Sequence, residues 1–183
     1  MGPIAARSFP GRRVVRTDER AKRVNDYGRR ARGYVFGIFL PHTGQAMTAT
    51  YPERTISHWI AFLERAEKWV PKRYTRVIAI LDNLSAHHAQ DVLLFILEHP
   101  RWEFLFQPAR AAYLNLIEPW WKVLRSLALT GRRFEDWQDV TVAILSATRY
   151  WNSHGHPFRW GKRRKRARRS LTVPRTPGLR LTA

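Results

Sequence analysis

Apolar and aromatic residues in the first half of the chain follow two patterns, one typical of strands and one typical of a helix. Residues 33–40 and 45–51 are rich in aromatic and β-branched side chains, and a Pro-His-Thr-Gly turn separates them. This pattern predicts a β-hairpin. In residues 55–70, apolar side chains recur near helical spacing, and either Thr55 or Ser57 suits the N-cap of a helix.

The second half of the chain continues with shorter apolar segments. The apolar run within residues 75–81 predicts a buried strand, and residues 102–106 predict a second, short strand. Helical spacing recurs in residues 89–98, 114–129 and 134–151. The order of these elements predicts the α/β class, with the hairpin and a parallel pair of strands in one mixed sheet that is flanked by helices.

Positive charge dominates the composition. The 183 residues include 33 Lys and Arg against 14 Asp and Glu, which gives a formal net charge of +19. An electrostatic field of this sign and size favours a polyanionic partner, so we expect the protein to bind nucleic acid. Residues 162–183 begin with seven basic residues in eight and continue without a pattern, which predicts a basic disordered tail.

Several classes of protein are excluded by what the sequence lacks. There is no cysteine, which rules out disulfide frameworks and thiolate metal sites and fits a cytoplasmic protein. No apolar run reaches the roughly 18 residues that a membrane-spanning helix needs, so no membrane partner is expected. The histidines do not follow a zinc-binding spacing, and no phosphate-binding loop or nucleophile-elbow motif is present.

Two carboxylates have neighbours that suggest a function. Asp82 directly follows the strand predicted within residues 75–81, and in open α/β sheets functional groups collect at such strand ends. The alternative is that Asp82 and Asn83 only form a turn or a helix cap. Glu118 lies among apolar residues, where a carboxylate costs free energy unless it is paired or binds a metal, and Pro119 suits the first turn of a helix.

Together these carboxylates predict a site for a hard cation. Glu118 has an alternative interpretation as an ordinary solvated side chain, but the oxygens of Asp and Glu suit Mg²⁺ or Mn²⁺. Such ions activate the attacking oxygen and stabilise the leaving oxygen in phosphodiester transfer, while a basic surface holds the DNA backbone. Asn83 and His87 are supporting candidates, as a hydrogen-bonding group and a phosphate contact.

Motifs around the two carboxylates resemble one family. The segments Leu81-Asp82-Asn83-x-x-x-His87, Gln107-Pro108 and 114–122 (Leu-Asn-Leu-Ile-Glu-Pro-Trp-Trp-Lys) are similar to the catalytic half of bacterial insertion-sequence transposases of the mariner-like DDE group. Similar motifs in residues 26–30 and 131–161 extend the resemblance over residues 2–161. The resemblance implies an RNase H-like (retroviral-integrase-like) fold and DNA cleavage and strand transfer in DNA transposition, with Mg²⁺ or Mn²⁺ as the cofactor.

The family has three metal-binding acidic residues, and the resemblance implies which residues of this chain correspond to them. Asp82 matches the second and Glu118 the third, with Asn115 as a further supporting residue. The first acidic residue lies at the end of the first, central strand, shortly before residues that match Gly2-Pro3 here. The matching position would therefore fall before Met1.

We therefore expect residues 1–161 to form a partial catalytic domain that lacks its first central strand and is inactive alone. By the resemblance, the absent strand would lie between the hairpin and the strand that ends at Asp82. The alternative is a non-catalytic basic protein that binds DNA.

Expected partners are DNA, at the element ends and at the target, an N-terminal transposase fragment and a second copy of the chain. The expected location is the cytoplasm, in association with the bacterial nucleoid. The basic side chains expected to contact DNA are Arg29, Arg30, Lys122, Arg125, Arg132, Arg133, Lys162, Arg163, Arg164, Lys165 and Arg166.

Overall fold

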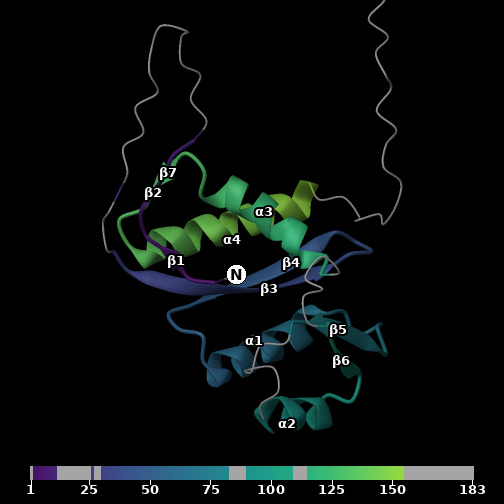
Figure 1. Ribbon diagram of the computed structural model, residues 1–183. Coiled ribbons are helices and arrows are strands. Elements are labelled where there is room, and N and C mark those ends of the chain that lie inside the picture. The colour runs from purple at the N-terminus through teal and green to yellow at the C-terminus, as the bar shows by residue number, and fades with distance from the viewer. Residues whose placement is uncertain (1, 12–25, 27–29, 83–89, 109–114, 155–183) are drawn as a thin grey trace, which may run out of the picture.

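The computed structural model of the chain describes residues 2–11, 26, 30–82, 90–108 and 115–154. Its helices and strands alternate in the order expected for the α/β class, with three additional short strands (Figure 1). The helices are α1 (Ile56–Trp69), α2 (Gln90–Glu98), α3 (Ile117–Ala128) and α4 (Trp137–His154). The strands are β1 (Ile4–Ala5), β2 (Ser8–Phe9), β3 (Arg32–Leu40), β4 (Gln45–Tyr51), β5 (Val77–Leu81), β6 (Trp102–Phe106) and β7 (Arg132–Arg133).

The β3–β4 hairpin lies between two layers of helices and confirms the predicted hairpin. Its strands pair antiparallel from Tyr34 opposite Tyr51 to Leu40 opposite Gln45, and Gly44 adopts a φ of 76° in the turn, which suits a residue without a Cβ. Successive side chains of a strand point to opposite faces. Both faces of this hairpin are therefore buried, one against α3 and α4 and the other against α1 (Figure 1).

The hairpin thus contributes to two hydrophobic cores. On one face, Val35 and Phe39 pack with the buried residues of α3 and α4, including Trp120 and Ile144. On the other face, Phe36 packs with the buried residues of α1, α2 and β6. We call these the α3–α4 core and the α1–α2 core.

The start of α1 follows the sequence pattern, because a capping residue sets it. Thr55 accepts a hydrogen bond from the backbone N–H of His58 (3.2 Å) and is the N-cap of α1, as predicted, whereas Ser57 lies inside the helix. The helix predicted from residue 114 begins only at Ile117. None of the helices in the described residues is long and apolar enough to cross a membrane.

The β5–β6 pair is parallel, as predicted, but β5 is not buried on both faces. Val77 and Ala79 pack into the α1–α2 core, whereas Ile78 and Ile80 are each 51% exposed. The prediction of a buried strand from residues 75–81 was therefore wrong for one face. A continuous apolar run is buried on both faces only if a second layer covers it, and Ile78 and Ile80 belong to neither of the two cores.

The described strands form three separate sheets rather than one mixed sheet. Their orders are β1-β3-β4, β2-β7 and β5-β6, so the hairpin and the parallel pair are not hydrogen-bonded to each other in the described residues. The pairs β1–β3 and β2–β7 join only two residues each, and no hydrophobic pattern predicts strands that short.

Glycines in β3 allow close approach of tryptophans from α3 and α4. A Cβ built on Gly37 would lie 2.4 Å from Cη2 of Trp121, and one on Gly33 would lie 2.3 Å from Cε2 of Trp137. We expect Gly37→Ala to lower the free energy of unfolding by about 1–3 kcal/mol, because the rigid indole must shift. Urea unfolding measures the change. Gly2→Ala is the control, since its Cβ would meet nothing within 4 Å, and equal stabilities of the two variants would contradict this packing.

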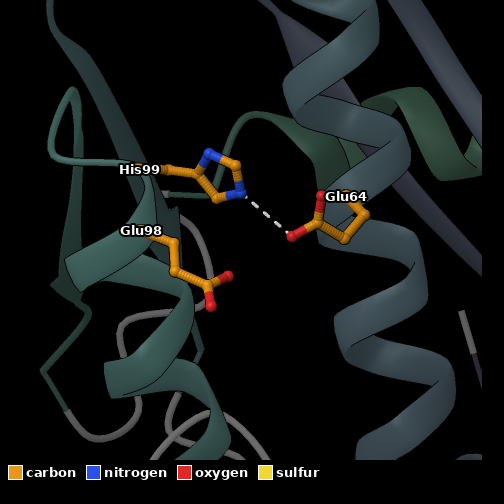
Figure 2. A group of neighbouring side chains, drawn as sticks. All are labelled: Glu64, Glu98 and His99. Atoms are coloured by element: carbon orange, nitrogen blue, oxygen red, sulfur yellow. Dashed lines mark hydrogen bonds and ion pairs between the residues drawn. The ribbon is translucent and has the colours of Figure 1, made fainter.

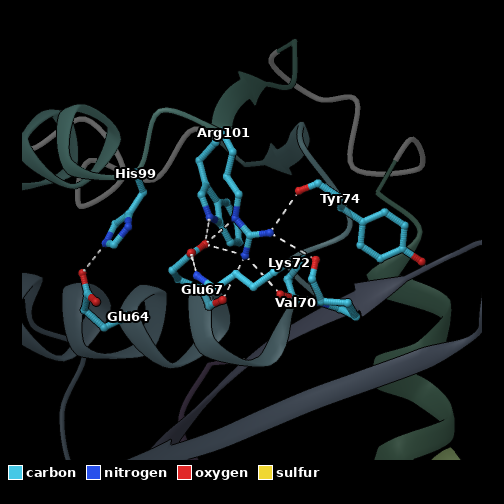
Figure 3. Close-up of polar contacts among 9 residues, drawn as sticks. Glu64, Glu67, Val70, Lys72, Tyr74, His99 and Arg101 are labelled. Carbon is cyan, nitrogen blue, oxygen red and sulfur yellow. Dashed lines mark hydrogen bonds and ion pairs between the residues drawn. The ribbon is translucent and has the colours of Figure 1, made fainter.

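A polar cluster around Glu67 ties α1 to the turn before β6 (Figure 3). The Glu67 carboxylate accepts hydrogen bonds from Nε of Arg101 (2.8 Å), from the indole N–H of Trp102 (2.6 Å) and from Lys72. The Arg101 guanidinium also donates to the backbone oxygens of Glu67 and Val70, both at 3.0 Å. Arg101 thereby satisfies carbonyl groups at the C-terminal end of α1, which have no partner within the helix.

Burial raises the pKa of Glu67, but the hydrogen bonds from Lys72, Trp102 and Arg101 and the charge of Arg101 outweigh it and lower the pKa from 4.5 to about 2. Because the folded-state pKa is the lower one, this stabilisation is complete above about pH 4.5 and is lost as the pH falls towards 2. We expect a loss of about 3 kcal/mol over this range. Urea unfolding at successive pH values checks the loss, and Glu67→Gln should remove this component of the pH dependence.

Candidate functional site

Asp82 lies where the sequence analysis placed it, directly after the last residue of β5, and its side chain is exposed. The strand reaches this position because β5 pairs with β6 along its whole length, from Val77 opposite Trp102 to Leu81 opposite Phe106. The backbone N–H of Gln107 also donates to the carbonyl oxygen of Leu81 (2.9 Å), so the backbone before Asp82 is held at its end.

Glu118 lies in the first turn of α3. This agrees with the prediction that it lies at the start of a helix. Asn115 holds this turn: its side-chain oxygen accepts from the backbone N–H of Ile117 (3.3 Å), and its backbone oxygen accepts from that of Glu118 (3.0 Å). Leu116 at the N-cap makes no capping bond with its side chain. Asn115 therefore holds the backbone of the first turn of α3, the turn that carries the Glu118 side chain.

The side chain of Glu118 is exposed, which corrects the argument that it occupies an apolar face. Trp120 and Trp121, two and three residues on, point into the α3–α4 core instead. Apolar neighbours in sequence do not share a face on a helix, because each residue is rotated by about 100° from the last. Glu118 therefore has no desolvation cost that a metal would have to offset.

Asp82 and Glu118, which are far apart in sequence, line the same groove. The groove has a volume of about 810 Å³ and runs between the facing edges of β3 and β5, with the start of α3 on one side. Arg76, Lys122 and Arg125 also line it. Arg54 lines the groove as well, so two carboxylates and four cationic side chains share it, and Asn115 lines it beside them.

Several other predicted site residues lie outside the described residues or away from the groove. Asn83, His87, Arg29 and the basic segment Lys162–Arg166 lie outside the described residues. Arg132 and Arg133 are exposed on β7, where Arg133 pairs with Glu135 (2.7 Å), and they are not among the residues that line the groove. Their predicted DNA contacts stay predictions.

Arg30 has structural contacts that the sequence analysis did not foresee. Its Nη1 donates to Asp26 (2.9 Å) and to the backbone oxygen of Phe134 (3.0 Å), and its Nε pairs with Glu135 (3.3 Å). Asp26 in turn accepts from the backbone N–H of Ser8 (2.8 Å). These contacts join the segment before β3 to the loop before α4, so Arg30 has a structural role whether or not it contacts DNA.

A second group of potential metal ligands is formed by Glu64 on α1 and by Glu98 and His99 at the end of α2 (Figure 2). Their ligand atoms lie within 4.8 Å of one another, and Nε2 of His99 is 3.0 Å from Oε1 of Glu64. The spacing of the histidines along the sequence does not reveal this group, because Glu64 comes from another helix. In the described residues this group joins α1 to α2 through the His99–Glu64 contact.

Comparison with known proteins places the chain in a family. The sequence model of the family described as DDE superfamily endonuclease matches residues 3–141, which is most of the chain. The chain belongs to the DDE superfamily endonuclease family. The match confirms the resemblance drawn from the sequence motifs. Transposases of this family use divalent metal ions.

Two kinds of relative agree with the DDE assignment. An insertion element IS630 protein of 39 kDa from Shigella sonnei is 23% identical over 142 residues, which cover 77% of this chain and 40% of that protein. Among solved structures, the Mos1 strand transfer complex matches 86% of this chain and 54% of the Mos1 chain, at 18% identity and a TM-score of 0.54. The Mos1 transposase paired-end complex with left transposon end gives a TM-score of 0.52, also at 18% identity.

The structural likeness shows that this DDE family member has the RNase H-like fold that the sequence analysis expected. The chain spans 40% of the length of the IS630 protein and about half of the length of the Mos1 chains. The exposed carboxylates of Asp82 and Glu118 in the groove are hard oxygen donors, and such donors fit Mg²⁺ or Mn²⁺. Mg²⁺ usually binds through one or two carboxylates and keeps several waters.

Proposed function

We propose that this chain is the catalytic-domain portion of a DDE transposase and that Asp82 and Glu118 hold the divalent metal for DNA cleavage and strand transfer. The observation that carries the proposal is that both carboxylates line one groove although β5 and α3 belong to different cores. When bound, the metal supplies Lewis-acid activation of a phosphodiester bond. The family match supports DNA transposition as the process.

The residues of the chain supply binding and orientation. Asp82 is carried at the end of a paired strand, and Glu118 is carried in a helix turn that Asn115 holds, so both donors start from fixed backbone. Arg76, Lys122 and Arg125 line the same groove and are suited to neutralise DNA phosphates beside the carboxylates. Each phosphate contact steepens the dependence of DNA affinity on salt.

We further propose that the 183-residue chain needs another carboxylate from outside its described residues in order to cleave. Among the described residues that line the groove, Asp82 and Glu118 are the only carboxylates. The proposed source is an N-terminal transposase segment. A second copy of the chain is a further proposed partner, because transposon ends come in pairs in the Mos1 paired-end complex.

Nicking of supercoiled plasmid DNA tests the function. The chain is assayed with Mn²⁺, with Mg²⁺ and with EDTA, alone and with an added N-terminal transposase segment. We expect metal-dependent nicked circles in the supplemented reaction and none with EDTA. DNA binding that is sensitive to salt, without nicking in any of these reactions, would instead support the non-catalytic DNA-binding alternative.

A further inference from the structure

The group formed by Glu64, Glu98 and His99 lies between α1 and α2, and none of the three is among the residues that line the groove. Figure 2 shows the three side chains pointing towards one another. All their ligand atoms lie within 4.8 Å of one another, and Nε2 of His99 is 3.0 Å from Oε1 of Glu64. Zinc bonds of about 2.0–2.2 Å place tetrahedral ligand atoms about 3.4 Å apart, so a small contraction of the group would enclose an ion.

The charge of this group is not balanced within the described residues. The sequence contains 33 Lys and Arg, yet in the part of the chain that the structure describes none of them forms an ion pair with Glu64 or Glu98. The imidazole of His99, which contacts Glu64, is the cationic partner available there. Two neighbouring carboxylates thus share one imidazole, and a bound cation would remove the repulsion between them.

The end of α2 adds a second electrostatic reason for a cation. Glu98 is the last residue of this helix, and the last turn contains no basic residue. The C-terminal end of a helix carries a partial negative charge, which disfavours a carboxylate and favours a cation. Glu98 is therefore placed where a bound cation would interact favourably with both the carboxylate and the helix end.

The imidazole of His99 is already held in place. Its backbone N–H donates to the carbonyl oxygen of Phe95, and its carbonyl oxygen accepts from the backbone N–H of Trp102, both at 2.9 Å. Its ring packs on the ring of Phe95, with centroids 4.5 Å apart. Glu64 is carried by α1, next to Leu63 in the α1–α2 core. Two ligands therefore start from fixed backbone, and the exposed side chain of Glu98 can adjust.

The donor atoms select the kind of metal. An imidazole nitrogen suits zinc and other transition metals, whereas Mg²⁺ and Ca²⁺ prefer oxygen ligands. Zn²⁺ accepts both His nitrogen and Glu oxygen, and where the protein supplies three ligands a water completes the tetrahedron. The pattern of one nitrogen and two carboxylate oxygens on two helices therefore fits Zn²⁺ better than the ions expected in the groove.

We propose that Glu64, Glu98 and His99 bind a Zn²⁺ ion that links α1 to α2. The ion takes the place of the proton between Nε2 of His99 and Oε1 of Glu64, and that proton is released to solvent. The site is independent of the chemistry proposed at the groove. Its effect is structural, because α1 and α2 pack in the core that also receives Val77 and Ala79 of β5.

Equilibrium dialysis of the full chain against Zn²⁺, followed by metal analysis, tests the site. We expect Glu98→Gln and His99→Gln each to weaken the binding of one Zn²⁺ by at least about 100-fold, since loss of an outer-shell partner alone costs 10–100-fold. A millimolar excess of Mg²⁺ should leave this Zn²⁺ bound. Glu98→Gln is the decisive variant if His99→Gln does not fold, because the Glu98 side chain is exposed.

Two control variants separate this site from other carboxylates. Asp91→Asn removes an exposed carboxylate at the start of the same helix and should bind Zn²⁺ as the unmodified chain does. The double variant Asp82→Asn, Glu118→Gln should also keep this Zn²⁺. A chain that binds zinc here but does not nick DNA, or the reverse, therefore separates this inference from the proposed function.

Hydrogen exchange measured by mass spectrometry tests whether the ion links the helices. Zn²⁺ should slow the exchange of backbone amides in α1 and α2 of the unmodified chain, but not in Glu98→Gln, and should leave α4 unchanged. Zinc binding that survives Glu98→Gln, or that is lost in the groove double variant, would overturn the inference. Displacement by Mg²⁺, or bound zinc that leaves both helices unprotected, would overturn it as well.

Discussion

Glu118→Gln is expected to reduce metal-dependent nicking of DNA on the order of 1000-fold in whichever form of the protein nicks. The neutral amide does not balance the charge of a divalent ion, so the metal is lost or misplaced. A 1000-fold loss corresponds to about 4 kcal/mol of transition-state stabilisation. Asp82→Asn should have an effect of the same order, since both carboxylates line the groove.

The control for this loss is a change of charge elsewhere. Asp91→Asn removes an exposed carboxylate at the start of α2 and should leave nicking unchanged. Because Asp82 and Glu118 are exposed, their amide variants should unfold within about 0.5 kcal/mol of the unmodified chain. Unchanged nicking by both variants would remove these carboxylates from the reaction, and a large loss of stability would give them a structural role instead.

Glu67→Ala is expected to lower the free energy of unfolding by about 3–5 kcal/mol, the largest change of stability that we predict. The side chains of Glu67 and Arg101 are 8% and 14% exposed, so removing the carboxylate leaves a buried guanidinium without its counter-charge. It also leaves the indole N–H of Trp102 without the acceptor that it uses. Urea unfolding at pH 7 measures the change.

The matched control is the exposed Arg76–Glu103 pair between β5 and β6. Its side chains are 70% and 51% exposed, and solvent-exposed ion pairs contribute at most about 1 kcal/mol. Glu103→Gln should therefore cost far less than Glu67→Ala. Similar losses for the two variants would show that burial does not set the strength of the Glu67 cluster.

Local pattern predicted the elements of this fold well, because each depends on residues close together in the chain. The hairpin, the helix capped by Thr55 and the strand Trp102–Phe106 follow from alternation, capping and spacing alone. The position of Asp82 after β5 and that of Glu118 in the first turn of α3 follow in the same way. Both candidate ligands were thus identified from sequence.

Features that depend on distant residues were missed. The exposure of Ile78 and Ile80 is set by what lies beside β5, and their own hydrophobicity does not indicate it. The contacts of Arg30 with Phe134 and Glu135 were not predicted, because the fold brings these residues together from distant parts of the chain. The Glu67 cluster has no sequence motif, since its partner Arg101 is 34 residues away. Charge and hydropathy along a chain do not specify such pairings.

The place of the two carboxylates in different cores has a further consequence. Asp82 follows a strand of the α1–α2 core, and Glu118 begins a helix of the α3–α4 core. A cation bound by both carboxylates links the α1–α2 core to the α3–α4 core. Metal binding then stabilises the contact between the cores, and by thermodynamic linkage that contact strengthens metal binding equally. Each tenfold excess of metal over its dissociation constant should add about 1.4 kcal/mol to stability. A variant that weakens the packing between the two cores should in turn bind the metal more weakly, even with no DNA present.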